Sequence, residues 1–195
     1  MANNNLLQRF EQTLLQVHPA VVKRLNSGLP VDEIDKIALS YQLAFTEDVY
    51  HLFTWKNGIR HETANTTDEL LLFPKGIPFS LLEAAHDYDL LSVTKHFFET
   101  SYFPLFSAGN EDILLINLDA YSPVYKMISL YSAALFGNET PVTVYDSFSS
   151  MLQTVIEGYG QKALWIEDDS LQVNDNAYHS IAAGLNPGSA FWNYM

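Results

Sequence analysis

The stretch Tyr102–Asp119, YFPLFSAGNEDILLINLD, determines how the rest of this chain is interpreted. It opens with an aromatic–proline segment, and turn-forming residues follow at 107–112. The run Ile113–Leu118 is a short block of branched apolar residues between turn formers, typical of a strand buried on both faces and too short for an ordinary helix. The stretch therefore predicts a hairpin at the centre of a sheet, with strands near 102–106 and 112–118.

The overall composition indicates one domain with a sizeable core. The chain has 195 residues, of which 48% are hydrophobic. Cysteine is absent, so the chain has no disulfide or thiolate metal site, which fits a reducing compartment. The N-terminal sequence has no signal-peptide pattern, and no apolar stretch approaches the roughly 20 residues of a membrane-spanning helix. We expect a cytoplasmic protein without membrane association.

The whole chain has a net charge of −13, and its negative charge is concentrated in the second half. Residues 1–98 hold 8 basic and 12 acidic residues, a net of −4, whereas residues 99–195 hold 11 acidic residues against Lys126 and Lys162, a net of −9. Nucleic-acid affinity comes largely from Lys and Arg, so we expect no nucleic-acid partner. The field would instead attract a basic protein, although solubility alone also explains such a charge.

Helical periodicity flanks the hairpin on both sides. Helix caps are expected at Thr46, at Ser80 and at either Asp146 or Ser147. Further strands are predicted near 71–73, 124–128 and 142–145, with a loop at 59–70 and a turn at 136–140. The predicted helices cover residues 5–17, 20–28, 31–45, 46–58, 81–100 (where 87–89 allow a break), 148–160 and 176–185.

No internal repeat, low-complexity tract or linker divides the chain. The economical interpretation is a single α+β domain, in which helices pack on a twisted mixed or antiparallel sheet. Within residues 1–195 we expect an N-terminal helical extension at 1–29, a core at 30–160 and a C-terminal segment at 161–195.

The histidines do not have the spacing of a metal site. His61 begins a pattern like HExxH, but position 65 is Asn65. His86 could bind a metal together with Asp87 and Asp89, yet these residues fit a solvated helix face better. We therefore expect no bound metal and no cofactor.

Catalytic signatures are missing as well. The sequence has no GxSxG elbow and no cysteine nucleophile, and its glycines form neither a phosphate-binding loop nor a dinucleotide fingerprint. The pair Glu111-Asp112 and the run Glu167–Asp169 could in principle perform acid–base chemistry. Catalytic carboxylates need distinct environments to separate their pKa values, however, and adjacent acidic residues in a loop are usually solvated. We expect a protein that is not an enzyme.

The order of several short motifs resembles that of the SUKH superfamily, which includes fungal cell-wall assembly regulators and many bacterial immunity proteins. The similarity covers residues 30–160, and Ala44-Phe45 departs from the Leu-Pro pair that is usual there. The motifs are DEI through FTEDVY to WKNG (32–58), LLLFPKGIPFSLLEAA (70–85), SYFPLFSAGNEDILLINL (101–118), SPVYKMISL (122–130) and VYDSFSSMLQTVIEGY (144–159).

The resemblance implies an α+β fold with helices against a twisted sheet and a binding role without catalysis. Many SUKH relatives neutralise a co-inherited toxin by occluding its active site. We therefore expect an immunity protein that binds a basic toxin domain, such as a nuclease. A regulatory adaptor in cell-envelope or signalling pathways is the second hypothesis, and an enzyme is the third. The sequence predicts no oligomeric state.

Acidic residues in turns are the candidate partner contacts, because turn side chains can reach a partner without disturbing the core. One group surrounds the central hairpin and the other follows the last long helix. The six residues are Glu111, Asp112 and Asp119 in the first group and Glu167, Asp168 and Asp169 in the second.

Overall fold

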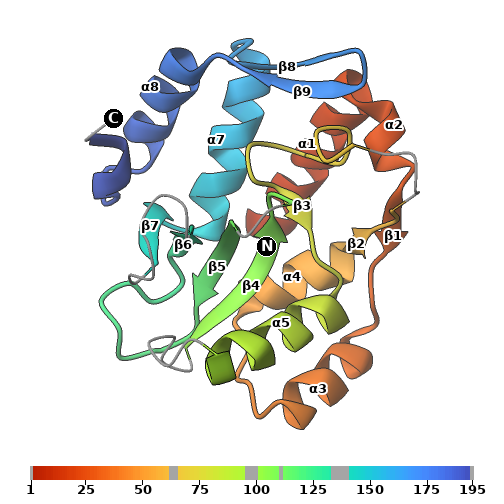
Figure 1. Cartoon of the computed structure of the whole chain (residues 1–195), viewed down its shortest axis with the longest axis vertical. Coiled ribbons are helices and arrows are strands. Elements are labelled where there is room, and N and C mark those ends of the chain that lie inside the picture. The colour runs from red at the N-terminus through yellow and green to blue at the C-terminus, as the bar shows by residue number, and fades with distance from the viewer. Residues whose placement is uncertain (1, 62–65, 95–100, 110–111, 133–140, 194–195) are drawn as a thin grey trace.

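The computed structural model describes residues 2–61, 66–94, 101–109, 112–132 and 141–193. It shows a single α+β domain in which helices pack around an antiparallel sheet (Figure 1). The helices are α1 (Ala2–Val17), α2 (Pro19–Val22), α3 (Val31–Ser40), α4 (Glu47–Trp55), α5 (Leu81–Thr94), α7 (Phe148–Gly160), α8 (Asp175–Leu185) and the 3-10 helix η1 (Ala190–Asn193). None of these described helices is long and apolar enough to cross a bilayer.

The main sheet has five strands in the order β3-β4-β5-β6-β7, and every neighbouring pair is antiparallel. A second sheet pairs β1 with β2, and a third pairs β8 with β9. The strands are β1 (Leu25–Ser27), β2 (Lys56–Ile59), β3 (Ile77–Pro78), β4 (Tyr102–Ser107), β5 (Ile113–Asn117), β6 (Ile128–Tyr131), β7 (Val142–Tyr145), β8 (Leu164–Glu167) and β9 (Ser170–Val173).

The predicted central hairpin is confirmed as β4 and β5, and β5 is the middle strand of the five. Phe103 lies opposite Ile116 and Ser107 lies opposite Ile113. The register shifts between Pro104 and Phe106, where proline has no N–H to donate to the ladder. The buried apolar run therefore lies where its composition predicts, inside the sheet.

Both faces of β5 are buried, in two separate clusters. Leu114 and Ile116 belong to the main core, and Leu115 packs against Tyr131 on the other side of the strand. This alternation follows from the two-residue period of a strand, which sends successive side chains to opposite faces. A single polar substitution at Leu115 therefore probes one face of the central strand.

Helix α1 is part of the main core, although the sequence set residues 1–29 apart as an extension. Phe10 of α1 packs against Phe73 with ring centroids 6.2 Å apart, and Phe73 packs against Phe106 of β4 at 5.0 Å. Leu7 and Leu14 are buried in the same cluster. The N-terminal helix is thus connected to the central hairpin by edge-to-face contacts between aromatic rings.

Several predicted helices and strands are wrong in their extent or place. The strand expected near 71–73 is not formed, because these residues make a bend before β3, and the helix expected at 31–45 ends at Ser40. The strand expected at 124–128 begins only at Ile128, because 119–127 form successive turns and Lys126 has a φ of 63°. The helix expected at 20–28 is the single turn α2, and β1 follows it. The helix expected to reach Gly58 ends at Trp55, and β2 follows.

Gly58 has a different role from the predicted helix stop. It lies inside β2 with a φ of +78°, and a Cβ there would lie 2.6 Å from the main-chain nitrogen of Ser80. Glycine is therefore required by a close approach of two backbones, not by the end of a helix.

The helix caps are partly confirmed. Ser80 caps α5 by accepting a hydrogen bond from Glu83 N at 3.3 Å, and the Glu83 carboxylate accepts from Ser80 N at 2.8 Å. Ser147 caps α7 in the same reciprocal way with Ser150. Thr46 occupies the cap position of α4, but its buried hydroxyl has no hydrogen-bond partner in the described part of the chain.

Three further predictions are tested only in part or not at all. Helix α5 is continuous through 87–89, without the break that the sequence allows. The predicted turn at 136–140 lies outside the described residues, as does the end of the helix predicted to reach residue 100.

Candidate functional site

The acidic residues around the central hairpin do not form an exposed group. Glu111 lies outside the described residues. Asp112 is only 5% exposed and its carboxylate is bound by the ammonium group of Lys75, so the expectation that Asp112 is free to contact a partner is wrong. Asp119 is half-buried, and its carboxylate accepts a hydrogen bond from Tyr121 N at 2.9 Å.

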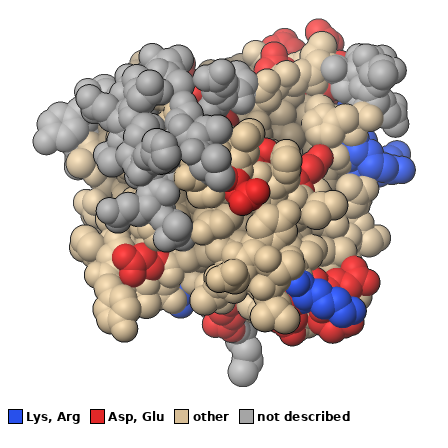
Figure 2. Space-filling model, turned by 60° about the horizontal axis from the view of Figure 1, so that its bottom comes forward, with Lys and Arg blue, Asp and Glu red and all other residues tan. Residues whose placement is uncertain are grey.

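Asp119 instead lines a cleft of about 550 Å³ at the end of β5. Tyr41, Leu43, Tyr88 and Leu118 form part of its wall. Figure 2 shows the face below the sheet, where most atoms belong to uncharged residues and the Lys and Arg side chains in view lie toward the edges. The cleft is therefore a mixed aromatic and polar hollow with one carboxylate.

The second acidic group, Glu167, Asp168 and Asp169, stays together and is exposed throughout. We call these three residues the acidic turn. Glu167 ends β8, and Asp168 and Asp169 connect it to β9 in a hairpin that the sequence did not predict; both aspartates have positive φ angles, 50° and 59°. Two successive positive φ angles are typical of a type I′ turn, a conformation that Asp tolerates better than most residues.

The base of this hairpin is firmly attached to the domain. Leu164 and Leu171 are buried in the main core, and Asn174 N donates to Ala163 O at 2.8 Å. In α7, which leads into the hairpin, the Tyr159 hydroxyl donates to Leu72 O at 2.8 Å. Burial raises the pKa of Tyr159, so the phenol keeps its proton and this bond at neutral pH. The fold thus presents three carboxylates on a well-supported turn.

Exposed aromatic residues accompany both candidate surfaces. Tyr121 is 98% exposed beside Asp119, and Trp165 of β8 is 40% exposed two residues before the acidic turn. Tyr and Trp are favoured anchors at protein interfaces. No sequence pattern separates these two exposed residues from the other aromatics, most of which are buried in the core.

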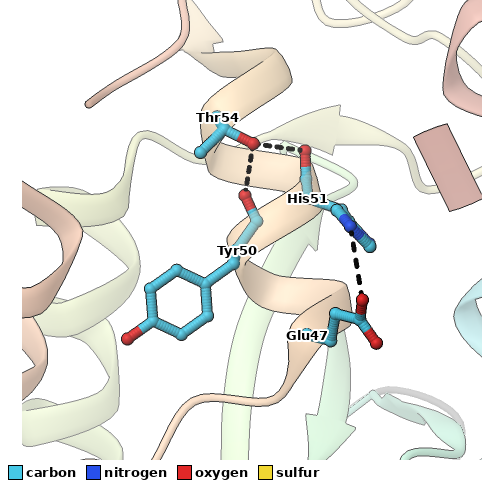
Figure 3. A network of polar contacts seen from close by, with 4 residues as sticks. All are labelled: Glu47, Tyr50, His51 and Thr54. Atoms are coloured by element: carbon cyan, nitrogen blue, oxygen red, sulfur yellow. Dashed lines mark hydrogen bonds and ion pairs between the residues drawn. The ribbon is translucent and has the colours of Figure 1, made fainter. Parts of the chain in front are cut away.

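A polar network on α4 has the appearance of a reactive site but is explained by helix structure (Figure 3). The Glu47 carboxylate lies 3.7 Å from His51 Nε2, one helical turn away. The Thr54 hydroxyl donates to the main-chain oxygens of Tyr50 and His51, at 2.6 and 3.3 Å. Thr54 is therefore not activated by the His51 ring, and the network contains no nucleophile–base pair.

Tyr50 extends this network to α3. Its hydroxyl donates to the Asp35 carboxylate at 2.6 Å. That hydrogen bond, aided by burial, raises the pKa of Tyr50, so the proton stays on the phenol. The contact attaches α3 to α4.

The histidines form no metal centre in the part of the chain that the structure describes, where no group of three or more His, Asp or Glu residues could hold an ion. His86 and Asp87 line a small pocket of about 190 Å³ with His61 and Glu83, and Asp89 is not part of it. Burial raises the pKa of Asp87, and the nearby Glu83 adds to the rise. The candidate ligands His86, Asp87 and Asp89 are therefore not brought together as a set.

Comparison with known proteins adds no relative, since no protein-family model matches the chain and no curated protein matches it. The acidic turn with Trp165 and the cleft at Asp119 remain the two candidate binding surfaces. They lie far apart, because β8 and β9 are at the top of the view in Figure 1 and α3 and α5, beside the cleft, are at the bottom.

Proposed function

We propose that this chain is a non-catalytic protein-binding domain, and that it serves as a cytoplasmic immunity protein that neutralises a basic toxin by direct binding. The observation that carries the proposal is the acidic turn, three consecutive exposed carboxylates on a supported hairpin, beside the exposed ring of Trp165. The motif order that resembles SUKH proteins supports the same role.

The physics of association favours such a turn as a recognition element. Negative charge attracts a basic partner over the screening length of roughly 10 Å at 0.1 M salt and speeds encounter. A turn whose backbone is already fixed loses little conformational freedom on binding. A nuclease toxin fits this surface, because an enzyme that holds nucleic acid needs Lys and Arg side chains around its active site.

A regulatory adaptor is the second candidate, and the cleft at Asp119 favours it. An adaptor holds more than one partner, and this chain has two candidate surfaces at opposite ends of the main sheet. The exposed Tyr121 fits a partner that is recognised by apolar contact.

The experiment that tests the immunity role is co-expression with the adjacent open reading frame, with growth as the readout. We expect expression of the adjacent open reading frame alone to arrest growth, and co-expression of this chain to restore growth. Reversal of all three residues of the acidic turn to Lys should abolish rescue. The matched control reverses three exposed acidic residues elsewhere, Asp32, Glu33 and Asp89, and should rescue as the wild type does.

An adjacent frame that is harmless, or a chain that fails to restore growth, would contradict the immunity role. Equal rescue by the reversed and control variants would contradict the role of the acidic turn.

A further inference from the structure

Strand β8 has an open edge. The hairpin register pairs Glu167 with Ser170, Ile166 with Leu171 and Trp165 with Gln172. In a two-residue hairpin the pair next to the turn exchanges hydrogen bonds and the following pair does not, and this alternation continues along the strands. The N–H and C=O of Ile166 therefore point away from β9, as do those of Leu164.

Two hydrogen bonds confirm this alternation. Asn174 N donates across the hairpin to Ala163 O at 2.8 Å, so odd-numbered residues of β8 face β9. Leu171 N donates outward, to Asp68 O at 3.4 Å, so the residue opposite Ile166 also points away from the hairpin. The free edge of β9 is thus partly covered, whereas the outward main-chain groups of Ile166 make no hydrogen bond within the described ranges.

A hollow of about 520 Å³ lies alongside this open edge. Its lining comes from β8, from the C-terminal end of α1 and from α7 with the residues that follow it, and none of it comes from β9. Val17, Tyr159 and Leu164 give it an apolar wall, and Trp165 and Ile166 belong to the strand itself. An extended chain placed against β8 would meet this wall with alternate side chains.

The charges along the edge differ between its two ends. The acidic turn lies at the C-terminal end of β8, and Lys162 lies just before its N-terminal end. An antiparallel strand, the more stable pairing, would bring its N-terminal residues beside the acidic turn. Basic residues therefore fit at the N-terminal end of an added strand, and uncharged ones fit along the rest.

We propose that the β8 edge accepts an extended segment of a protein partner as an added antiparallel strand, with basic residues at the N-terminal end of that segment. The inference rests on the proposed binding role and specifies its contact. A second copy of this chain is a poorer occupant, because two chains of net charge −13 repel each other and the edge is only four residues long.

The test uses the full chain and a capped synthetic peptide, Lys-Lys-Val-Thr-Val-Thr-Val, with amide hydrogen exchange followed by NMR. At a peptide concentration of ten times the Kd, exchange of the Ile166 amide should slow about tenfold, because only the free fraction exchanges. Exchange at Trp165 and Glu167, whose amides already bond to β9, should change less than twofold. A peptide with Glu-Glu in place of Lys-Lys should bind at least tenfold more weakly.

Two proline variants provide a matched pair. Ile166→Pro removes an outward N–H of β8 and should abolish peptide binding without breaking a bond of the hairpin. Val173→Pro removes an outward N–H of β9, on the opposite edge, and should bind normally. If Ile166→Pro fails to fold, the exchange rates of the wild type still provide the test.

The edge site is overturned if saturating peptide leaves the Ile166 amide unprotected, if the acidic peptide binds equally well, or if the chain dimerises through β8 in sedimentation. These outcomes are separable from failure of the immunity role. A toxin that is neutralised without protection of Ile166 would refute the edge site alone, and peptide binding without any toxin neutralisation would refute the immunity role alone.

Discussion

Replacement of Leu115 by Asp should destabilise the domain severely, because this side chain is fully buried in the middle strand of the sheet. Truncation to Ala alone removes apolar contacts with Tyr131 and costs about 3 kcal/mol, within the range for buried Leu residues. An aspartate adds the desolvation of a carboxyl group, so we expect a total loss of at least about 4 kcal/mol out of an ordinary stability of about 5–15 kcal/mol.

The assay is urea unfolding at pH 7, followed by tryptophan fluorescence and circular dichroism. With a urea dependence of about 2.5 kcal/mol/M, the midpoint should fall by about 1.5 M or more. The urea midpoint of Leu115→Ala should lie between those of Leu115→Asp and the wild type. Leu82→Asp, at a position 63% exposed on α5, is the control and should change stability by less than about 0.5 kcal/mol. A Leu115→Asp variant with the wild-type midpoint would refute the placement of β5.

Two other predictions concern buried ionisable groups. Asp112→Asn should cost about 1–3 kcal/mol in urea unfolding, because it leaves Lys75 without its buried carboxylate partner; Asp168→Asn, in the exposed acidic turn, should cost less than about 0.5 kcal/mol. Burial lowers the pKa of His18 below 6.5, so the unfolded state binds more protons below that pH and stability should fall as the pH drops from 7.5 to 5.5. His18→Asn should reduce this pH dependence, measured as the urea midpoint at both pH values, whereas His61→Gln, at an exposed residue, should leave it unchanged.

Equal stability of Asp112→Asn and Asp168→Asn would mean that the contact with Lys75 contributes nothing to folding. An unchanged pH dependence in His18→Asn would mean that another group titrates in its place.

The sequence predicted those parts of the fold whose signals are local. The run Ile113–Ile116 is apolar and bounded by turn formers, so its central position follows from composition. The caps at Ser80 and Ser147 are also predictable, because each serine bonds to a residue only three positions later in the sequence. Strands β1 and β2 were not predicted, because residues 25–27 and 56–59 are extended only through their pairing with each other. No local sequence pattern indicates a pairing across that separation.

The candidate site was predictable only in part, for two different reasons. The turn between β8 and β9 uses Asp168-Asp169 in place of the more recognisable Asn-Gly, so a two-residue hairpin between alternating runs was overlooked. The exposure of an acidic residue depends on what lies beside it in space. Asp112 is bound by Lys75, 37 residues away in the chain, and no sequence pattern connects the two.

The most direct test of the proposed binding role is the association rate with the protein that the adjacent open reading frame encodes, measured against ionic strength for the wild type and for the acidic turn reversed to Lys. For the wild type we expect the rate to fall about tenfold or more between 0.02 and 0.5 M salt, because the attraction is screened. The reversed variant should associate more slowly at low salt and depend less on salt, and its melting temperature should fall only slightly, because Lys fits the positive φ angles at 168 and 169 less well than Asp does. Association that is insensitive both to salt and to the reversal would contradict the account.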